Sequence, residues 1–101
     1  MLHIVNKSPF ERNALATCLR LAADDSAVLL IEDGVVAAAN NTRFGGLLAD
    51  GMKRNLKFFV LSHDAAARGL APERLVPGVE TVDYGGFVDL VTSHDTVQSW
   101  L

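Results

Sequence analysis

The stretch LHIVNKSPFERNALATCLRLAA, residues 2–23, decides the fold that this sequence predicts. Its apolar beginning, Leu2–Val5, indicates a short strand, and the following segment, Ser8–Ala23, predicts an amphipathic helix. The first residue of that segment suits the helix N-cap, Pro9 suits the first turn, and Glu11 completes a capping box. A strand followed at once by a helix is the building unit of α/β folds.

The rest of the chain repeats this alternation. The expected strands are Leu2–Val5, Ala27–Ile31, Leu56–Leu61, Val79–Val82 and Thr96–Trp100. The expected helices are Ser8–Ala23, Val35–Ala39, Phe44–Arg54, Asp64–Leu70 and Phe87–Ser93. Strands that are almost continuously apolar and separated by helices imply a parallel sheet covered on both faces. We therefore expect a single α/β domain over residues 1–101, a three-layer α/β/α sandwich with a mainly parallel sheet of about five strands.

Composition narrows the range of functions. The 101 residues are 50% hydrophobic and carry a net charge of −3, with nine basic residues scattered along the chain. Such scattering gives no cationic stripe, so we expect no direct nucleic-acid binding. No apolar segment of 18 residues and no secretory signal occur, which predicts a cytoplasmic protein without membrane contact. The high apolar content for a small domain favours oligomerisation.

Motifs for bound cofactors and metals are missing where this fold would need them. After the first strand the chain reads Asn6-Lys7-Ser8-Pro9, which is neither a dinucleotide-binding glycine motif nor a phosphate-binding loop. It also lacks the acidic residues that a phosphorelay receiver carries at this point. Metal-ligating residue types are dispersed, so we expect no metal and no cofactor. They are His3, Cys18, His63 and His94.

Polar residues that follow the strands are the candidates for ligand binding, because ligands of parallel α/β sheets gather beyond the carboxyl ends of the strands. Lys7, Asp33, His63 and Tyr84 occupy such positions. Asp33 is equally well explained as the N-cap of the next helix. For His63 a structural role is preferred, with Asp64 as the cap of the helix that follows.

Cys18 is the only cysteine, and a reducing cytoplasm would keep it a thiol. In the expected helix, Ala14 and Ala22 lie four residues to either side of it. Leu15 and Leu21 lie three residues away, so the thiol falls on the apolar stripe. No cation on the same helix stands near enough to lower its pKa, which favours an inert, buried thiol.

Several segments together resemble the TusB/DsrH family of sulfur-relay proteins, and the similarity runs over essentially the whole chain. They are Met1–Asn13 (MLHIVNKSPFERN), Leu29–Val35 (LLIEDGV), Ala67–Leu70 (ARGL), Val82–Tyr84 (VDY), Phe87–Leu90 (FVDL) and Val97–Trp100 (VQSW). The resemblance implies the same three-layer sandwich. It also implies that the chain is the smallest subunit of a heterohexamer that holds two copies of three related chains.

The resemblance also implies an accessory role. Persulfide sulfur in this family is carried chiefly by a cysteine of a DsrE/TusD-like subunit, beside a DsrF/TusC-like subunit, and passes to a DsrC/TusE-like carrier. Cys18 follows the SPFERN segment as in DsrH, whereas TusB members typically lack a cysteine there. We therefore expect a DsrH-like subunit serving dissimilatory sulfur oxidation. A TusB subunit for 2-thiolation of the tRNA wobble uridine, a persulfide sulfurtransferase that acts independently through Cys18, and an independent small-ligand binding module remain alternatives.

Three residues carry the site predictions that follow from this. Cys18 is a candidate persulfide site, where a thiolate would attack the terminal sulfur of a donor persulfide. Tyr84 and Trp100 are candidate interface anchors, since both residue types are enriched at protein interfaces, although burial within the fold explains them equally well.

Overall fold

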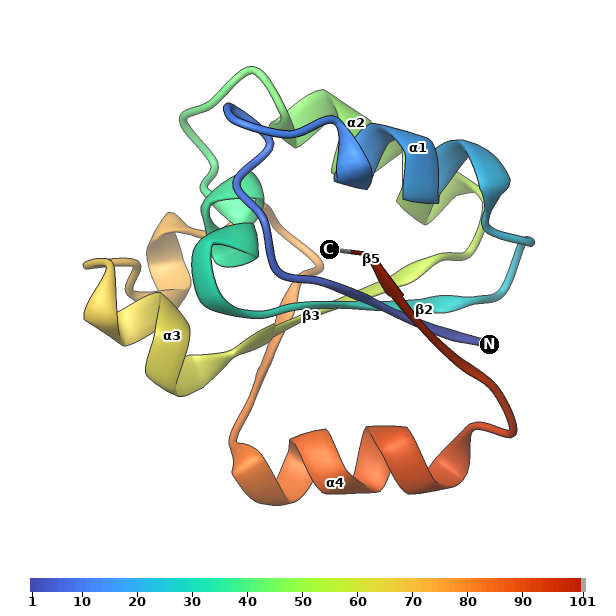
Figure 1. Cartoon of the computed structure of the whole chain (residues 1–101). Coiled ribbons are helices and arrows are strands. Elements are labelled where there is room, and N and C mark those ends of the chain that lie inside the picture. Colours follow the sequence, from blue (N-terminus) through green and yellow to red (C-terminus); the bar gives the residue numbers. More distant parts are fainter. Residues whose placement is uncertain (101) are drawn as a thin grey trace.

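The computed structural model describes residues 1–100 and contains a five-stranded parallel sheet with strand order β4-β3-β2-β1-β5. Figure 1 shows helices on both sides of this sheet, which confirms the expected α/β/α sandwich. The elements are β1 (Leu2–Val5), α1 (Ala14–Leu21), β2 (Ala27–Leu30), the 3₁₀ helix η1 (Glu32–Ala38), α2 (Gly45–Lys53), β3 (Lys57–Leu61), α3 (Ser62–Ala67), the 3₁₀ helix η2 (Pro72–Arg74), β4 (Glu80–Val82), α4 (Tyr84–Ser93) and β5 (Val97–Trp100).

The two faces of the sheet are covered unequally. Helices α1 and α2 lie on one face, and α4 crosses the other face alone (Figure 1). Alternate strand residues point to opposite faces, so the strands feed two separate cores. The larger core, on the α1 and α2 side, includes the fully buried Phe58 and Leu48. Among residues 1–100, the buried members of the smaller core under α4 are Leu2, Ala27 and Leu29.

Helix α1 begins at Ala14, so the predicted helix start at Ser8 and its capping box are wrong. The serine forms a turn instead: its carbonyl accepts from the N–H of Glu11 at 3.1 Å, and its hydroxyl accepts from the N–H of Phe10 at 3.2 Å. The turn carries the Phe10 ring edge-on to Phe44, with ring centroids 4.9 Å apart. This long-range contact overrides the local helix signal.

Helix α4 begins earlier than the predicted Phe87, because Asp83 caps it. The Asp83 carboxylate accepts a hydrogen bond of 2.7 Å from the N–H of Gly86, and the helix starts at Tyr84. With 10 residues, α4 is still short. Among residues 1–100, no helix has the length and apolar character needed to cross a membrane.

Candidate functional site

Cys18 lies in the middle of α1 and is fully buried. Its side chain belongs to the larger core, together with Leu15, Leu19 and Ala22 of the same helical region. The free thiol thus fills a position between α1 and the sheet that a small apolar residue would also fill. This placement agrees with the apolar stripe expected from the sequence.

Burial also controls the chemistry of this thiol. Loss of hydration raises the pKa of Cys18 from an ordinary value of 9.0 to about 12. Near neutral pH the group is therefore protonated, whereas sulfur exchange requires a thiolate. The persulfide role of Cys18 stays a prediction, and it requires that α1 move away from the sheet to expose and ionise the sulfur.

Beyond the carboxyl ends of β2 and β3, two acidic side chains tie the turn after β2 to α3. The backbone of Glu32 has a left-handed φ of 51°, and its N–H donates to the Asp64 carboxylate at 2.7 Å. The Arg68 guanidinium holds the Asp33 carboxylate at 2.8 Å. Close packing completes the turn, because a Cβ on Gly34 would stand 2.3 Å from the carbonyl oxygen of Val5.

The helix-cap roles expected of Asp33 and Asp64 are therefore wrong. The N-cap positions of η1 and α3 are Ile31 and Leu61, and neither makes a side-chain capping bond. Both carboxylates instead bond to residues more than thirty positions away. Sequence-local rules do not detect such pairs, because the partner becomes a neighbour only through the parallel pairing of β2 and β3.

The four strand-end residues do not surround a common cavity. Among residues 1–100, none of the described pockets is lined by Lys7, Asp33, His63 or Tyr84. Two of them are close to each other: the rings of His63 and Tyr84 are tilted, with centroids 6.1 Å apart. The carboxylate of Asp33 instead forms an ion pair with Arg68.

The outer side of helix α4 exposes two large apolar side chains among polar ones, and of these two only Tyr84 was expected from the sequence as an interface residue. The exposed fractions are 61% for Tyr84 and 56% for Val88, which lie four residues apart on the same helical face. Its inner residues Phe87 and Leu90 pack against the smaller core but are themselves only partly buried. None of the residues of α4 is buried. The sequence indicates this surface through the four-residue spacing of Tyr84 and Val88, which places both side chains on one face of a helix.

Trp100 is half-buried and fastens β5 to β1. Its indole N–H donates to Nδ1 of His3 at 3.1 Å, and the two rings lie 6.1 Å apart. The ring also packs against the larger core. The structure thus gives Trp100 a contact within the chain, while its role at an interface stays a prediction.

Comparison with known proteins agrees with this architecture. Among solved structures, the ychN protein from E. coli superposes with a TM-score of 0.84 at 21% identity, covering 97% of each chain. A protein of unknown function from Methanobacterium thermoautotrophicum superposes with a TM-score of 0.80 at 19% identity, covering 97% of this chain and 96% of that one. At such low identity these similarities concern the fold.

Sequence comparison is more specific. The chain is 36% identical to Protein TusB of Enterobacter sp. (strain 638) over 100 residues, which covers 99% of this chain and 100% of the relative. It is 32% identical to Protein TusB of Buchnera aphidicola subsp. Baizongia pistaciae, with the same coverage. The family described as "DsrH like protein" matches residues 7–97. The chain therefore belongs to the TusB/DsrH family.

Proposed function

We propose that this chain is a TusB-type accessory subunit of a cytoplasmic sulfur relay that serves 2-thiolation of the tRNA wobble uridine. Its partners in this proposal are TusC/DsrF-like and TusD/DsrE-like subunits, with two copies of each chain in a heterohexamer. A TusE/DsrC-like protein accepts the sulfur. Full-length relatives named TusB support this choice of branch.

The buried position of Cys18 makes it a weaker argument for choosing between the DsrH branch and the TusB branch. The preference for a DsrH role in sulfur oxidation depends on the presence of this cysteine. Packing alone explains a buried thiol with a pKa of about 12. The presence of this cysteine therefore does not indicate that the chain carries sulfur. The named relatives therefore favour the tRNA branch over the sulfur-oxidation branch.

One observation carries the accessory role: α4 exposes large apolar side chains on one side of the sheet, while the thiol of Cys18 is buried on the other side. Tyr84 and Val88 extend this surface outward, while the core beneath it remains thin. Exposed apolar patches of this kind mark protein contacts. In the proposed complex the sister subunits cover α4, and the main relay cysteine resides on the TusD/DsrE-like chain.

The test is deletion of the gene in the organism that encodes it, followed by complementation with the wild-type chain or Cys18→Ala. The proposal expects loss of 2-thiouridine from tRNA, measured by nucleoside mass spectrometry, and recovery with both chains. Unchanged 2-thiouridine together with a loss of sulfur-compound oxidation would contradict the tRNA role and restore the DsrH one. Recovery by wild type alone, with the Cys18→Ala chain present at the wild-type level in immunoblots, would assign a sulfur-handling role to Cys18.

A further inference from the structure

A groove runs between α1 and α2 on the face of the sheet opposite α4. It consists of two adjoining hollows of about 120 Å³ and 220 Å³, which share Ala16 of α1 and Leu47 of α2. Leu15 and Leu19 contribute apolar surface to its floor. Drug-sized ligands occupy pockets of about 300–1,000 Å³, so each hollow suits single side chains better than a cofactor.

The rim of this groove is cationic although the whole chain is acidic. Arg12 and Arg43 line one hollow, and Arg20 lines the other. Among residues 1–100, no carboxylate forms an ion pair with any of these three guanidinium groups. The one acidic residue that lines the groove, Asp50, stands 3.8 Å from Lys53. The groove thus offers unpaired positive charge beside apolar surface.

Arg43 is held in place by aromatic rings. Its guanidinium carbon lies 4.9 Å from the centroid of the Phe44 ring and 5.3 Å from that of Phe10. A guanidinium stacked on rings loses rotamer freedom but keeps its N–H edge free for a carboxylate. The Phe10 ring itself is 53% exposed and extends the apolar surface at this end.

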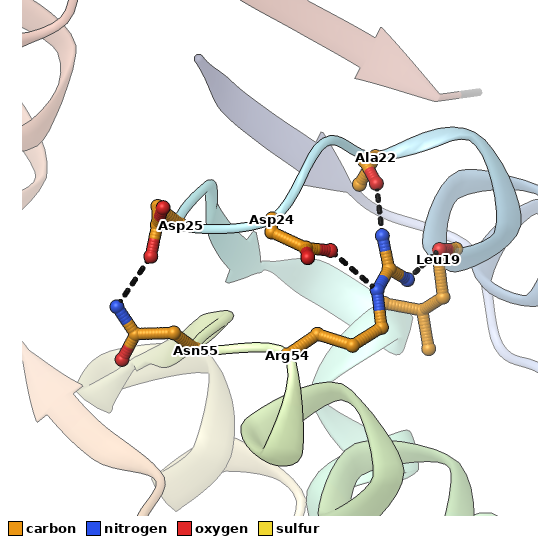
Figure 2. A network of polar contacts seen from close by, with 6 residues as sticks. All are labelled: Leu19, Ala22, Asp24, Asp25, Arg54 and Asn55. Carbon is orange, nitrogen blue, oxygen red and sulfur yellow. Dashed lines mark hydrogen bonds and ion pairs between the residues drawn. The ribbon is translucent and has the colours of Figure 1, made fainter.

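A polar clamp at the other end holds the two helices together. Figure 2 shows Arg54, which follows α2, reaching the end of α1. Its guanidinium donates to the carbonyl of Leu19 at 2.6 Å, to the carbonyl of Ala22, and to the Asp24 carboxylate at 2.9 Å. These bonds satisfy carbonyls at the helix end that lack helical partners. They also set the separation of α1 and α2, so the groove is formed before any ligand arrives.

We propose that the groove between α1 and α2 binds an acidic amphipathic segment of a partner protein. Apolar side chains of that segment would enter the two hollows, while its carboxylates pair with Arg12, Arg20 and Arg43. Charge complementarity identifies this occupant, because guanidinium groups bind carboxylates with directed, charge-assisted hydrogen bonds. The groove lies on the opposite side of the sheet from α4, away from the surface that we propose the sister subunits cover.

The experiment is a selection of random 16-residue peptides displayed on phage against the purified full chain. The selected peptides are then synthesised and measured by fluorescence anisotropy. The expected sequences combine Asp or Glu with Leu, Ile or Phe, and their affinity falls as salt rises. Arg12→Glu with Arg20→Glu should weaken binding at least tenfold, whereas Lys57→Glu, an exposed cation on β3, should change it less than twofold. Leu47→Asp tests the apolar contact in the same way.

Three outcomes would overturn the proposal. The selected peptides could lack acidic residues, or they could bind the arginine variants as tightly as the wild type. Sedimentation could also show self-association that the arginine variants abolish, which would assign the groove to a second copy of the chain. Circular dichroism of each variant separates lost binding from lost folding. Val88→Asp, a change on α4, should keep peptide binding. The peptide result therefore tests the groove even if the proposed relay function is wrong.

Discussion

The indole Nε1 of Trp100 donates a hydrogen bond of 3.1 Å to Nδ1 of His3, across the parallel pair of β1 and β5. Because Nδ1 accepts, the proton of the neutral imidazole resides on Nε2. That Nε2 is buried and has no partner among residues 1–100. The pair therefore requires a neutral His3.

The first prediction concerns acid stability. Burial, and secondarily the charge of the N-terminal amino group, lowers the pKa of His3 below its ordinary value of 6.5. As the pH falls below about 6.5, the unfolded chain takes up a proton that the folded chain excludes, so the free energy of unfolding decreases. Urea unfolding at pH 7.5 and 5.5 measures this loss. His3→Phe should flatten the slope, while the exposed His63→Gln should retain it; equal slopes in all three proteins would refute the assignment.

Cys18 should be chemically silent in the folded state. We expect no reaction with Ellman's reagent in buffer and complete reaction in denaturant. Because its folded pKa is about 12 and its ordinary value 9.0, the stability contributed by the protonated thiol is full below pH 9 and is lost as the pH rises toward 12. Cys18→Ala should cost about 1 kcal/mol near neutral pH and remove that part of the alkaline slope. Rapid labelling of the native protein would show that α1 opens readily.

Arg54→Ala should destabilise the protein by about 2 kcal/mol, because the carbonyls of Leu19 and Ala22 lose a charged donor. Arg54→Lys should recover little, since one ammonium group cannot reproduce the planar fork. The neighbouring Lys53→Ala, which breaks an exposed ion pair of 3.8 Å, should change stability by less than about 0.5 kcal/mol. Chemical denaturation of the three variants checks this order, and similar losses for Arg54→Ala and Lys53→Ala would contradict it.

Two glycines offer a matched comparison. Gly34→Ala should cost about 3 kcal/mol or more, because the new methyl would meet the Val5 carbonyl at 2.3 Å in a buried turn. Gly46→Ala should gain up to about 1 kcal/mol, since it lies in α2 with open space around it. Thermal melts decide the comparison. Equal tolerance of both changes would mean that the turn after β2 relaxes freely.

Val88→Asp should separate assembly from folding. The valine side chain is 56% exposed, so the stability of the single chain should change by less than about 1 kcal/mol. A charge in the middle of an apolar contact is costly, so co-purification with the sister subunits of the proposed complex should be lost. Ala49→Asp, an exposed change on α2, serves as the control. Retention of the full complex by Val88→Asp would place the assembly surface elsewhere.

The central strands β1, β2 and β3 were predictable because buried parallel strands are short apolar runs bounded by polar residues, whereas β4 and β5 are mostly exposed edge strands. Leu2–Val5 was expected with its observed bounds, and the other four strands were each expected within one residue of their observed ends. The burial of Cys18 followed from the same apolar periodicity. These features depend on local composition, which the sequence displays directly.

Features that depend on distant partners were not predictable in the same way. Ser8 has the neighbours of a helix cap, yet the packing of Phe10 on Phe44 makes a turn there. Asp64 resembles a cap, but its carboxylate receives the N–H of Glu32 from another strand end. In each case a local preference of about 1 kcal/mol yields to contacts that exist only after the sheet has formed.

The strand order also determines when the sheet can be completed during synthesis of the chain. β5 pairs with β1 but follows the other four strands along the chain, so β1 stays an open edge until β5 has been synthesised. Until then His3 lacks Trp100, and the backbone of β1 is free to pair with other chains. Completion of the sheet by β5 therefore covers this edge of β1 late in synthesis, and β5 itself becomes the edge strand on that side of the sheet.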